Sequence, residues 1–167
     1  GTCVFDWVIP REWKVRDAYI VTPSGKTICS FKENNLHLVG YSVPVSGTFS
    51  LGELQAHLHS LPKKPEAIPY VTSYYEERWG FCLSENERQG LEEGDYQVCI
   101  DSELFDGGMT YAELVIPGAS KEEVFLSTYI CHPSMANNEL SGPCVTTFLA
   151  KWLLELENRK YTYRIIF

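Results

Sequence analysis

The chain has 167 residues, of which 44% are hydrophobic and 13% aromatic, and its formal net charge is -8. This composition is typical of a globular protein and excludes a disordered chain. The acidic balance argues against nucleic acid as a partner, because no run of Lys or Arg is present to bind phosphates. The apolar runs are far shorter than the ~20 residues that span a bilayer, so we expect no membrane partner either.

Six cysteines are spread along the chain without a C-x-x-C motif or a close pair. Cys29, Cys99 and Cys131 fall inside strand-like runs, where a free thiol behaves as a small apolar residue. We therefore expect six free thiols and a cytoplasmic location. Residues 161–167 have the pattern of an apolar strand that needs neighbours on both faces. From this pattern we expect the chain to be a piece of a longer protein.

Strand and turn patterns dominate the chain up to about residue 117. Residues 15–31 predict a β-hairpin, because the segment 23–26 between two β-rich runs contains the Pro and Gly of a tight turn. Residues 36–45 predict a further extended segment. Residues 106–108, Asp-Gly-Gly, predict a hairpin turn that leads into a strand at 109–118.

Two short helices are predicted from their first residues. Ser50 with Glu53, and Ser84 with Glu87, have the spacing of a capping box, in which each side chain caps the backbone of the other. Between the second helix and the Asp-Gly-Gly turn, residues 96–101 alternate apolar and polar side chains, which predicts a strand with one buried face.

The pattern changes near Lys121. Residues 122–131, EEVFLSTYIC, are nearly continuously apolar, as in a strand that is buried on both faces of a parallel sheet. Residues 143–157 have helical spacing, and 161–167 form another strand pattern. This order predicts a βαβ unit with parallel strands and a right-handed crossover. The apolar face of the helix is predicted to consist of Val145, Phe148, Leu149, Trp152, Leu153 and Leu156.

The loop after the apolar strand carries the main candidate site. His132 follows that strand directly, and ligands of α/β sheets bind beyond the carboxyl ends of strands. Imidazole is a common metal ligand, and oxygen atoms of Asn138 or Glu139 lie close enough in sequence to complete a chelate. The alternative is a structural loop, in which His132 caps the strand end and the asparagines form turns.

Three separated motifs carry a resemblance that covers nearly all of the chain: FDWVIPREWKVRDAYI, AIPYVTSYYEERWGFCLS and STYICHPS. They resemble a group of bacterial aminopeptidase-like proteins in which a β-rich domain is inserted into the peptidase domain. The segment CHPSMANNELSGP, followed by an apolar helix, resembles the metal loop of co-catalytic zinc aminopeptidases.

The resemblance implies that His132 is the first zinc ligand, that Asn138 occupies the position of an aspartate bridging two zinc ions, and that Glu139 is its neighbour. A neutral amide lacks the negative charge that holds two divalent ions together. The site therefore holds one ion, or Glu139 substitutes for the bridge, or the site is degenerate. The remaining ligands and the glutamate general base are expected beyond Phe167.

The expected fold class is mixed α and β. Residues 1–14 would end a preceding peptidase-like segment, 15–117 would form the inserted β-rich domain, and 118–167 would form part of an α/β aminopeptidase-like sandwich with parallel strands.

Three other features of the sequence are weaker candidates for a functional site. The aromatic and charged segment 73–81 either walls a substrate pocket or packs in the core, and core packing is favoured. His57 and His59 point to different faces of a helix and are expected on the surface. Cys131 and His132 are adjacent, which is unsuited to a thiolate–imidazole pair.

Two functions from different classes follow. The first is a zinc-dependent aminopeptidase-like hydrolase that acts on a peptide or amide bond and is incomplete in this chain. The second is a non-catalytic module that binds a peptide or glycan and retains a degenerate peptidase-like site. His132 favours the first function and Asn138 favours the second.

Overall fold

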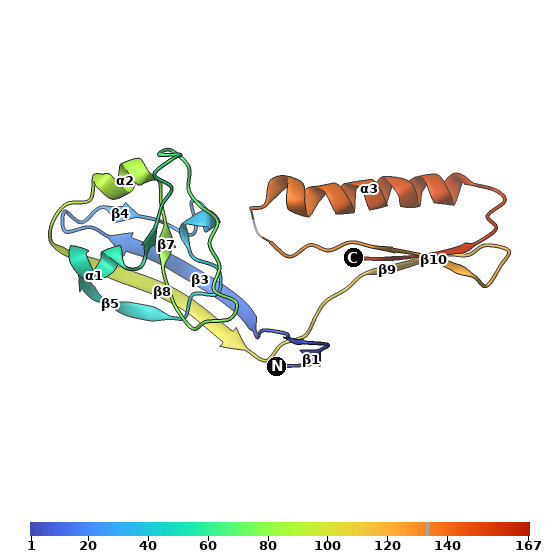
Figure 1. Cartoon of the computed structure of the whole chain (residues 1–167), viewed down its shortest axis with the longest axis horizontal. Coiled ribbons are helices and arrows are strands. Elements are labelled where there is room, and N and C mark those ends of the chain that lie inside the picture. Colours follow the sequence, from blue (N-terminus) through green and yellow to red (C-terminus); the bar gives the residue numbers. More distant parts are fainter. Residues whose placement is uncertain (133) are drawn as a thin grey trace. The chain divides into compact units, whose positions relative to one another are not determined.

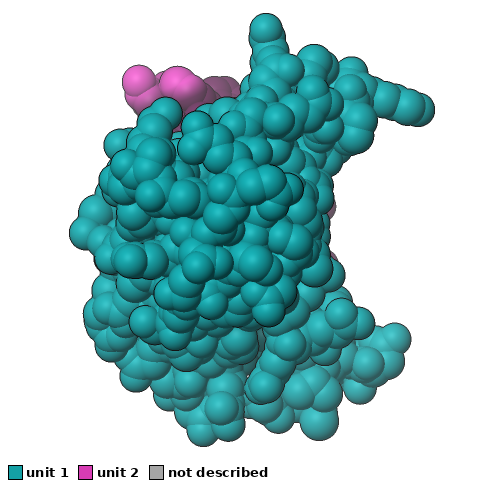
Figure 2. All heavy atoms as spheres, turned by 90° about the vertical axis from the view of Figure 1, so that its left-hand side faces the viewer, with its two compact units in different colours: residues 1–108 teal, residues 109–167 magenta. Residues whose placement is uncertain are grey.

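Strands in this computed structural model form several small sheets, with helices packed on them, so the fold is a mixture of α and β. The structure describes residues 1–132 and 134–167. These residues form two units, 1–108 and 109–167, which Figure 2 colours teal and magenta. The expected mixed fold class is confirmed at this level.

Unit 1 is built on a four-stranded antiparallel sheet with the strand order β4–β3–β8–β5 (Figure 1). The hairpin predicted over 15–31 is present, and its turn is closed by a hydrogen bond of 2.9 Å from Thr22 N–H to the Lys26 carbonyl. The strands are β3 (Glu12–Val21), β4 (Thr27–Ile28), β5 (Val45–Ser50) and β8 (Asp95–Phe105).

Both predicted capping boxes are present. Ser50 caps α1 (Leu51–Gln55) and Ser84 caps α2 (Glu85–Gln89), and in each the glutamate three residues on accepts from the cap backbone. The predicted alternation in β8 is also confirmed. Its inward side chains pack in the core of unit 1 together with those of other elements: Ala18, Ile20, Leu54, Phe81, Tyr96, Val98 and Ile100.

The extended segment predicted over residues 36–45 is wrong. A 3-10 helix η1 (Asn35–His37) occupies its start, and Tyr41 has a left-handed backbone with φ of 65°, which breaks any strand. The strand begins only at Val45. Short pieces complete the unit: β1 (Cys3–Val4), β2 (Trp7–Val8), β6 (Leu58–His59) and β7 (Phe81–Cys82).

Unit 2 contains a three-stranded sheet with the order β10–β11–β9 and one helix. As predicted, β10 (Glu123–Ser127) and β11 (Thr162–Ile166) are parallel, joined through α3 (Ala136–Glu155). The helix lies along the sheet in Figure 1. Ile116, Ala150, Leu153 and Ile165 form the buried core.

The segment 109–117 differs from its prediction. It contains β9 (Glu113–Ile116), which pairs antiparallel with β11 and forms no hairpin with β8. The structure therefore places 109–117 in unit 2, whereas the sequence analysis assigns these residues to the β-rich domain. It also places residues 1–11, with β1 and β2, in unit 1.

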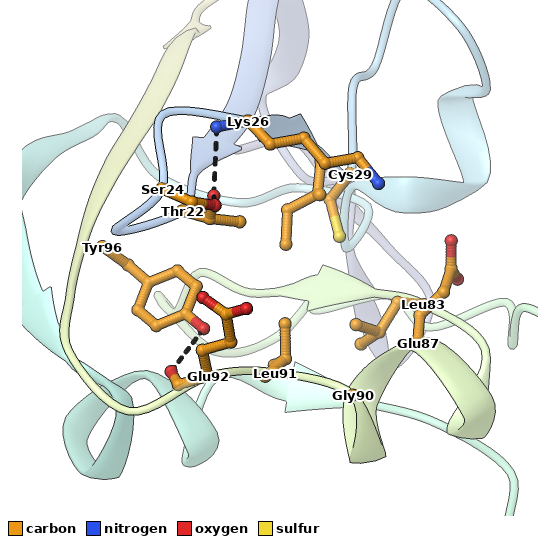
Figure 3. A pocket seen from close by; sticks show the side chains of 11 residues that line it. Thr22, Ser24, Lys26, Cys29, Leu83, Glu87, Gly90, Leu91, Glu92 and Tyr96 are labelled. Atoms are coloured by element: carbon orange, nitrogen blue, oxygen red, sulfur yellow. Dashed lines mark hydrogen bonds between the residues drawn. The ribbon is translucent and has the colours of Figure 1, made fainter.

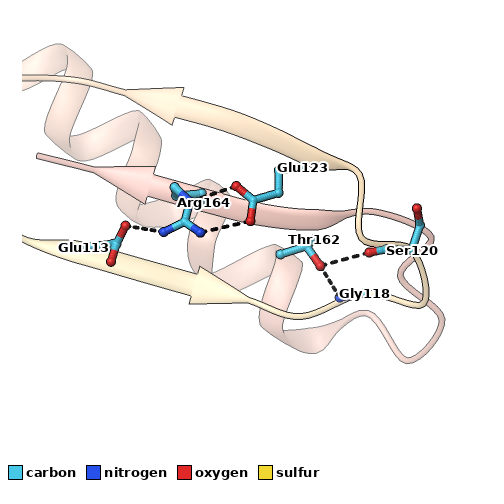
Figure 4. Close-up of polar contacts among 6 residues, drawn as sticks. All are labelled: Glu113, Gly118, Ser120, Glu123, Thr162 and Arg164. Atoms are coloured by element: carbon cyan, nitrogen blue, oxygen red, sulfur yellow. Dashed lines mark hydrogen bonds and ion pairs between the residues drawn. The ribbon is translucent and has the colours of Figure 1, made fainter.

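An arginine on the central strand ties the three strands of unit 2 together (Figure 4). Arg164 makes two hydrogen bonds to Glu123 on β10, of 2.8 and 2.9 Å, and a third contact to Glu113 on β9. Both acids raise the pKa of Arg164, with Glu123 contributing most. Because the three residues are partly exposed, we read this network as fixing strand register more than overall stability.

Helix α3 begins seven residues before the predicted start, because Pro143 lies inside the helix and does not begin it. Within its predicted apolar face, Leu153 is buried in the core, whereas Phe148 and Trp152 are 73% and 56% exposed. Likewise β10 is not buried on both faces, since Phe125 is 59% exposed. In the part of the chain that the structure describes, no helix has both the length and the apolar character to cross a membrane.

Candidate metal centre

The candidate site lies where the loop after β10 meets the first turn of α3. Helix α3 passes very close to the strand end at this point, since a Cβ on Gly142 would lie only 2.2 Å from the Thr128 hydroxyl. Glycine therefore allows an approach that no other residue could make without a shift. One helical turn before Gly142, the same approach brings Glu139 to the loop.

Glu139 is the buried acid of the site, with 8% of its surface exposed. Its carboxylate accepts the Cys131 backbone N–H at 2.5 Å and lies 2.8 Å from Nδ1 of His132. Burial opposes the charged form, but the hydrogen bonds from Cys131 and His132 outweigh it, so the pKa of Glu139 lies below its usual range. The acid is therefore ionised and fixes the loop to the helix.

The contact with Glu139 also determines the state of His132. When Nδ1 donates to the carboxylate, the basic nitrogen of the ring is Nε2, which is the form of imidazole that binds a metal ion. The ring is about one-third exposed and lies edge-on to Tyr129, with centroids 6.1 Å apart. His132 is thus oriented by the charge of Glu139 and contacts the ring of Tyr129.

Cys131 is the residue that sequence reasoning rejected. Its Sγ lies 2.8 Å from Nδ1 of His132 and 4.0 Å from the Glu139 carboxylate. Adjacent side chains alternate only within a strand, and β10 ends at Ser127, so in the loop both can turn to one side. Burial and the charge of Glu139 raise the pKa of Cys131, which keeps it a thiol.

Among the described residues, Cys131, His132 and Glu139 are the group whose donor atoms could hold a metal ion, all within 4.8 Å of one another. Sulfur, imidazole nitrogen and carboxylate oxygen are the donors that zinc accepts, so these residues fit the implied ion. Asn138 is exposed, and the structure brings Glu139 to His132 in its place. This follows from the helix, where neighbours point about 100° apart.

The other predicted features lie elsewhere. His57 and His59 are partly buried, so the expectation of surface positions is wrong; His57 stacks on Trp79 with ring centroids 3.6 Å apart. In the segment 73–81, Phe81 is fully buried as expected. Tyr75, in contrast, is 79% exposed, so this segment does not belong to the core throughout.

Unit 1 has a pocket of about 300 Å³ between the β3–β4 hairpin and α2 (Figure 3). Tyr96 forms one wall and donates its hydroxyl to the Glu92 carbonyl at 2.7 Å. Cys29 lies in the pocket, and burial raises its pKa to about 12, so it is an unreactive thiol. The pocket lacks a donor cluster of the kind found around His132.

Comparison with known proteins adds a family and one relative. The model of a family described as "Domain of unknown function (DUF2172)" matches residues 12–103. A Clostridium acetobutylicum protein named "Putative polysaccharide biosynthesis protein with aminopeptidase-like domain" is 51% identical over all 167 residues. A crystal structure of a "putative peptidase" from Clostridium acetobutylicum matches the whole chain with a TM-score of 0.93 and 51% identity. The chain spans 38% and 39% of the length of these two.

The Glu139 contacts lead to a prediction about the loop. Glu139→Gln is expected to release the His132 ring, because a neutral amide accepts hydrogen bonds more weakly than a carboxylate. The measurement is the ¹⁵N spectrum of the ring, which should change from one dominant tautomer to a mixture. The matched control is Glu155→Gln, at the exposed end of the same helix.

The same contacts set a pH dependence. Since the pKa of Glu139 is lowered on folding, its stabilisation is fully present at neutral pH and is lost as pH falls through the lowered value. The side-chain carboxyl ¹³C signal of Glu139 should therefore titrate below the range of an ordinary glutamate. An unchanged tautomer in Glu139→Gln would contradict the orienting role.

Proposed function

The chain belongs to the DUF2172 family, and on that premise we propose that it forms part of a zinc-dependent, aminopeptidase-like hydrolase. The observation that carries the proposal is His132 at the strand end, oriented by a buried, ionised Glu139. The names of the two similar proteins, one a "putative peptidase" and one with an "aminopeptidase-like domain", support the same reaction class. The substrate would be a peptide or a related amide.

In this proposal His132 is a ligand of the ion, and Glu139 orients His132 and holds the proton of Nδ1. The chemistry that zinc supplies when bound is polarisation of the scissile carbonyl and activation of a water molecule. Glu139 would instead be a direct ligand if the ion bound at Nδ1 in place of that proton. Asn138 is the candidate for a second ion.

The proposal is tested with the full-length protein and a panel of aminoacyl nitroanilides. Hydrolysis of at least one member is expected, with loss on treatment with a chelator and recovery when zinc is added back. Chelation should abolish the rate because the ion is needed for both the carbonyl and the water. Hydrolysis that survives complete removal of metal, or its absence in zinc-loaded protein across the panel, would contradict the proposal.

A substitution that adds a negative charge at position 138 tests whether a second zinc ion can bind. Asn138→Asp is expected to raise the zinc content of the full-length protein towards two ions per chain, because a carboxylate supplies the negative charge that a bridge requires. Zinc content is measured by plasma mass spectrometry. The matched control is Asn137→Asp, which makes the same charge change one residue earlier on the same exposed turn. Equal content in both variants would contradict a role for position 138.

A further inference from the structure

Four aromatic rings of unit 1 form a row in which each ring contacts the next, and the last ring is exposed to solvent. Trp13 on β3 stacks on Tyr41, with centroids 5.6 Å apart and planes 15° apart. Tyr41 then meets Tyr74 at 4.6 Å, and Tyr74 meets Tyr75 at 6.2 Å, both tilted. Tyr75 is 79% exposed. The row therefore joins the edge of the core to the surface.

The row is held rigidly by an unusual backbone. Tyr41 has φ of 65°, a left-handed conformation that costs free energy for any residue other than glycine. Its two neighbours fix it in place. The carbonyl of Ser42 accepts from the Trp13 indole at 3.0 Å and from the Ser102 hydroxyl at 2.8 Å. The carbonyl of Gly40 accepts from the Ser73 hydroxyl at 3.0 Å.

These anchors mean that the rings need little reordering to bind a ligand. Ser73, which holds Gly40, also begins the turn that carries Tyr74 and Tyr75, since Glu76 N–H bonds to the Ser73 carbonyl at 3.4 Å. The left-handed residue and the exposed turn are thus one connected structure. Strained backbone that is fixed by its surroundings is a feature of binding sites, because a preorganised surface loses less entropy on binding.

A pocket of about 180 Å³ opens beside the row. This volume is below the range for drug-sized ligands, so it suits one ring or one residue of a longer chain. Aromatic faces and both signs of charge surround it. The lining includes Arg11, Tyr41, Tyr74, Tyr75, Glu76 and Glu77.

We propose that this pocket binds one sugar ring of a neutral carbohydrate chain. The C–H face of a pyranose is apolar and weakly positive, and it is complementary to the negative face of a tyrosine ring. The hydroxyl groups at the edge of the sugar both donate and accept hydrogen bonds. Glu76 and Glu77 accept, and the Arg11 guanidinium donates, so the rim offers both partners.

The charges at the rim argue against other ligands. A cation would gain from the rings and from the two glutamates but would meet Arg11, and an anion would meet Glu76 and Glu77. Arg11 is held at the rim by an ion pair of 3.3 Å with Asp106, and because both side chains are mostly exposed this pair compensates its charge only weakly. A neutral ligand with many hydroxyl groups avoids these penalties. The site lies in unit 1 and involves no metal ion, so its test is independent of the hydrolase proposal.

The test is calorimetric titration of the full-length protein with cellotetraose, chitotetraose and maltotetraose. At least one is expected to bind. Tyr75→Ala should weaken that binding about tenfold, the effect of losing one stacking face, while Tyr75→Phe should retain it. The matched control is Tyr111→Ala, which removes a ring that is 68% exposed on unit 2. It should leave the affinity unchanged.

Three outcomes overturn the proposal. One is the absence of binding by all three oligosaccharides up to millimolar concentration. Another is sugar binding that is weakened equally by Tyr75→Ala and Tyr111→Ala, because the sugar would then not bind specifically in the pocket beside Tyr75. The third is that tetra-alanine binds and the oligosaccharides do not, with the binding again weakened by Tyr75→Ala. The pocket would then be a peptide site.

Discussion

His132→Ala in the full-length protein is expected to lower zinc-dependent hydrolysis by more than about a hundredfold, since even residues that only support a metal ligand are worth 10–100-fold. The variant removes the ring that Glu139 orients and leaves a buried carboxylate with one partner fewer. The rate is measured with the best nitroanilide of the panel at saturating zinc. This is the largest functional effect that the site predicts.

The control for this variant is His59→Gln, which changes a partly buried histidine that belongs to unit 1, whereas the donor cluster belongs to unit 2. It should retain the wild-type rate. Circular dichroism should show that unit 1 of His132→Ala unfolds at the wild-type temperature. If His132→Ala hydrolyses the substrate at the wild-type rate, the loop is structural.

Phe81→Ala is expected to have the largest effect on stability, about 3–5 kcal/mol in the free energy of unfolding of unit 1. Phe81 is fully buried at the centre of the unit, and its N–H bonds to the His57 carbonyl at 2.8 Å. Alanine at this position leaves a cavity that neighbouring strands cannot fill without moving. Urea unfolding followed by tryptophan fluorescence provides the measurement.

Phe5→Ala is the matched control, because Phe5 belongs to the same unit and its side chain is fully exposed. Its effect should stay within about 0.5 kcal/mol. A loss of less than about 1 kcal/mol in Phe81→Ala would mean that the core of unit 1 repacks around the gap, contrary to the close packing described here.

The parts of the fold that could be predicted from the sequence are those that local rules determine. Each capping box needs only two residues three positions apart, and both were present as predicted. The alternation in β8 and the parallel pairing of β10 with β11 were also predicted from the sequence and are present in the structure. Predictions failed where a distant contact decided the structure. Tyr41 adopts its left-handed backbone because Trp13, Ser73 and Ser102 fix its neighbours, and no local pattern indicates this.

The candidate site, like the fold, could be predicted from the sequence only in part. His132 and Glu139 could be proposed from their position after an apolar strand and from a family resemblance. Their contact depends on Gly142, whose missing side chain lets the helix approach Thr128. Cys131 was missed because it was placed inside a strand-like run as a small apolar residue and because its position next to His132 was judged unsuited to a catalytic pair, whereas β10 ends at Ser127. A strand end at Ser127 would have been the signal for including it.

The helix α3 shows a further limit. Within its predicted apolar face, Leu153 is buried, whereas Val145 and Phe148 are 59% and 73% exposed in this chain. An apolar stripe indicates that one face of a helix packs against another element, but it does not identify that element. Pro143 misled the prediction of the helix start, because proline is typical of a first turn and here stands in the interior.

Zinc binding by His132, oriented by Glu139, is the step on which the proposed function depends. The most direct measurement is the zinc content of the full-length protein, purified without chelator and dialysed against metal-free buffer. We expect at least one tightly held ion per wild-type chain, a marked loss in His132→Ala, and an intermediate loss in Glu139→Gln; these results would support zinc binding at His132. Wild-type zinc content in His132→Ala would contradict it, as would a wild-type protein that retains no metal after loading with zinc.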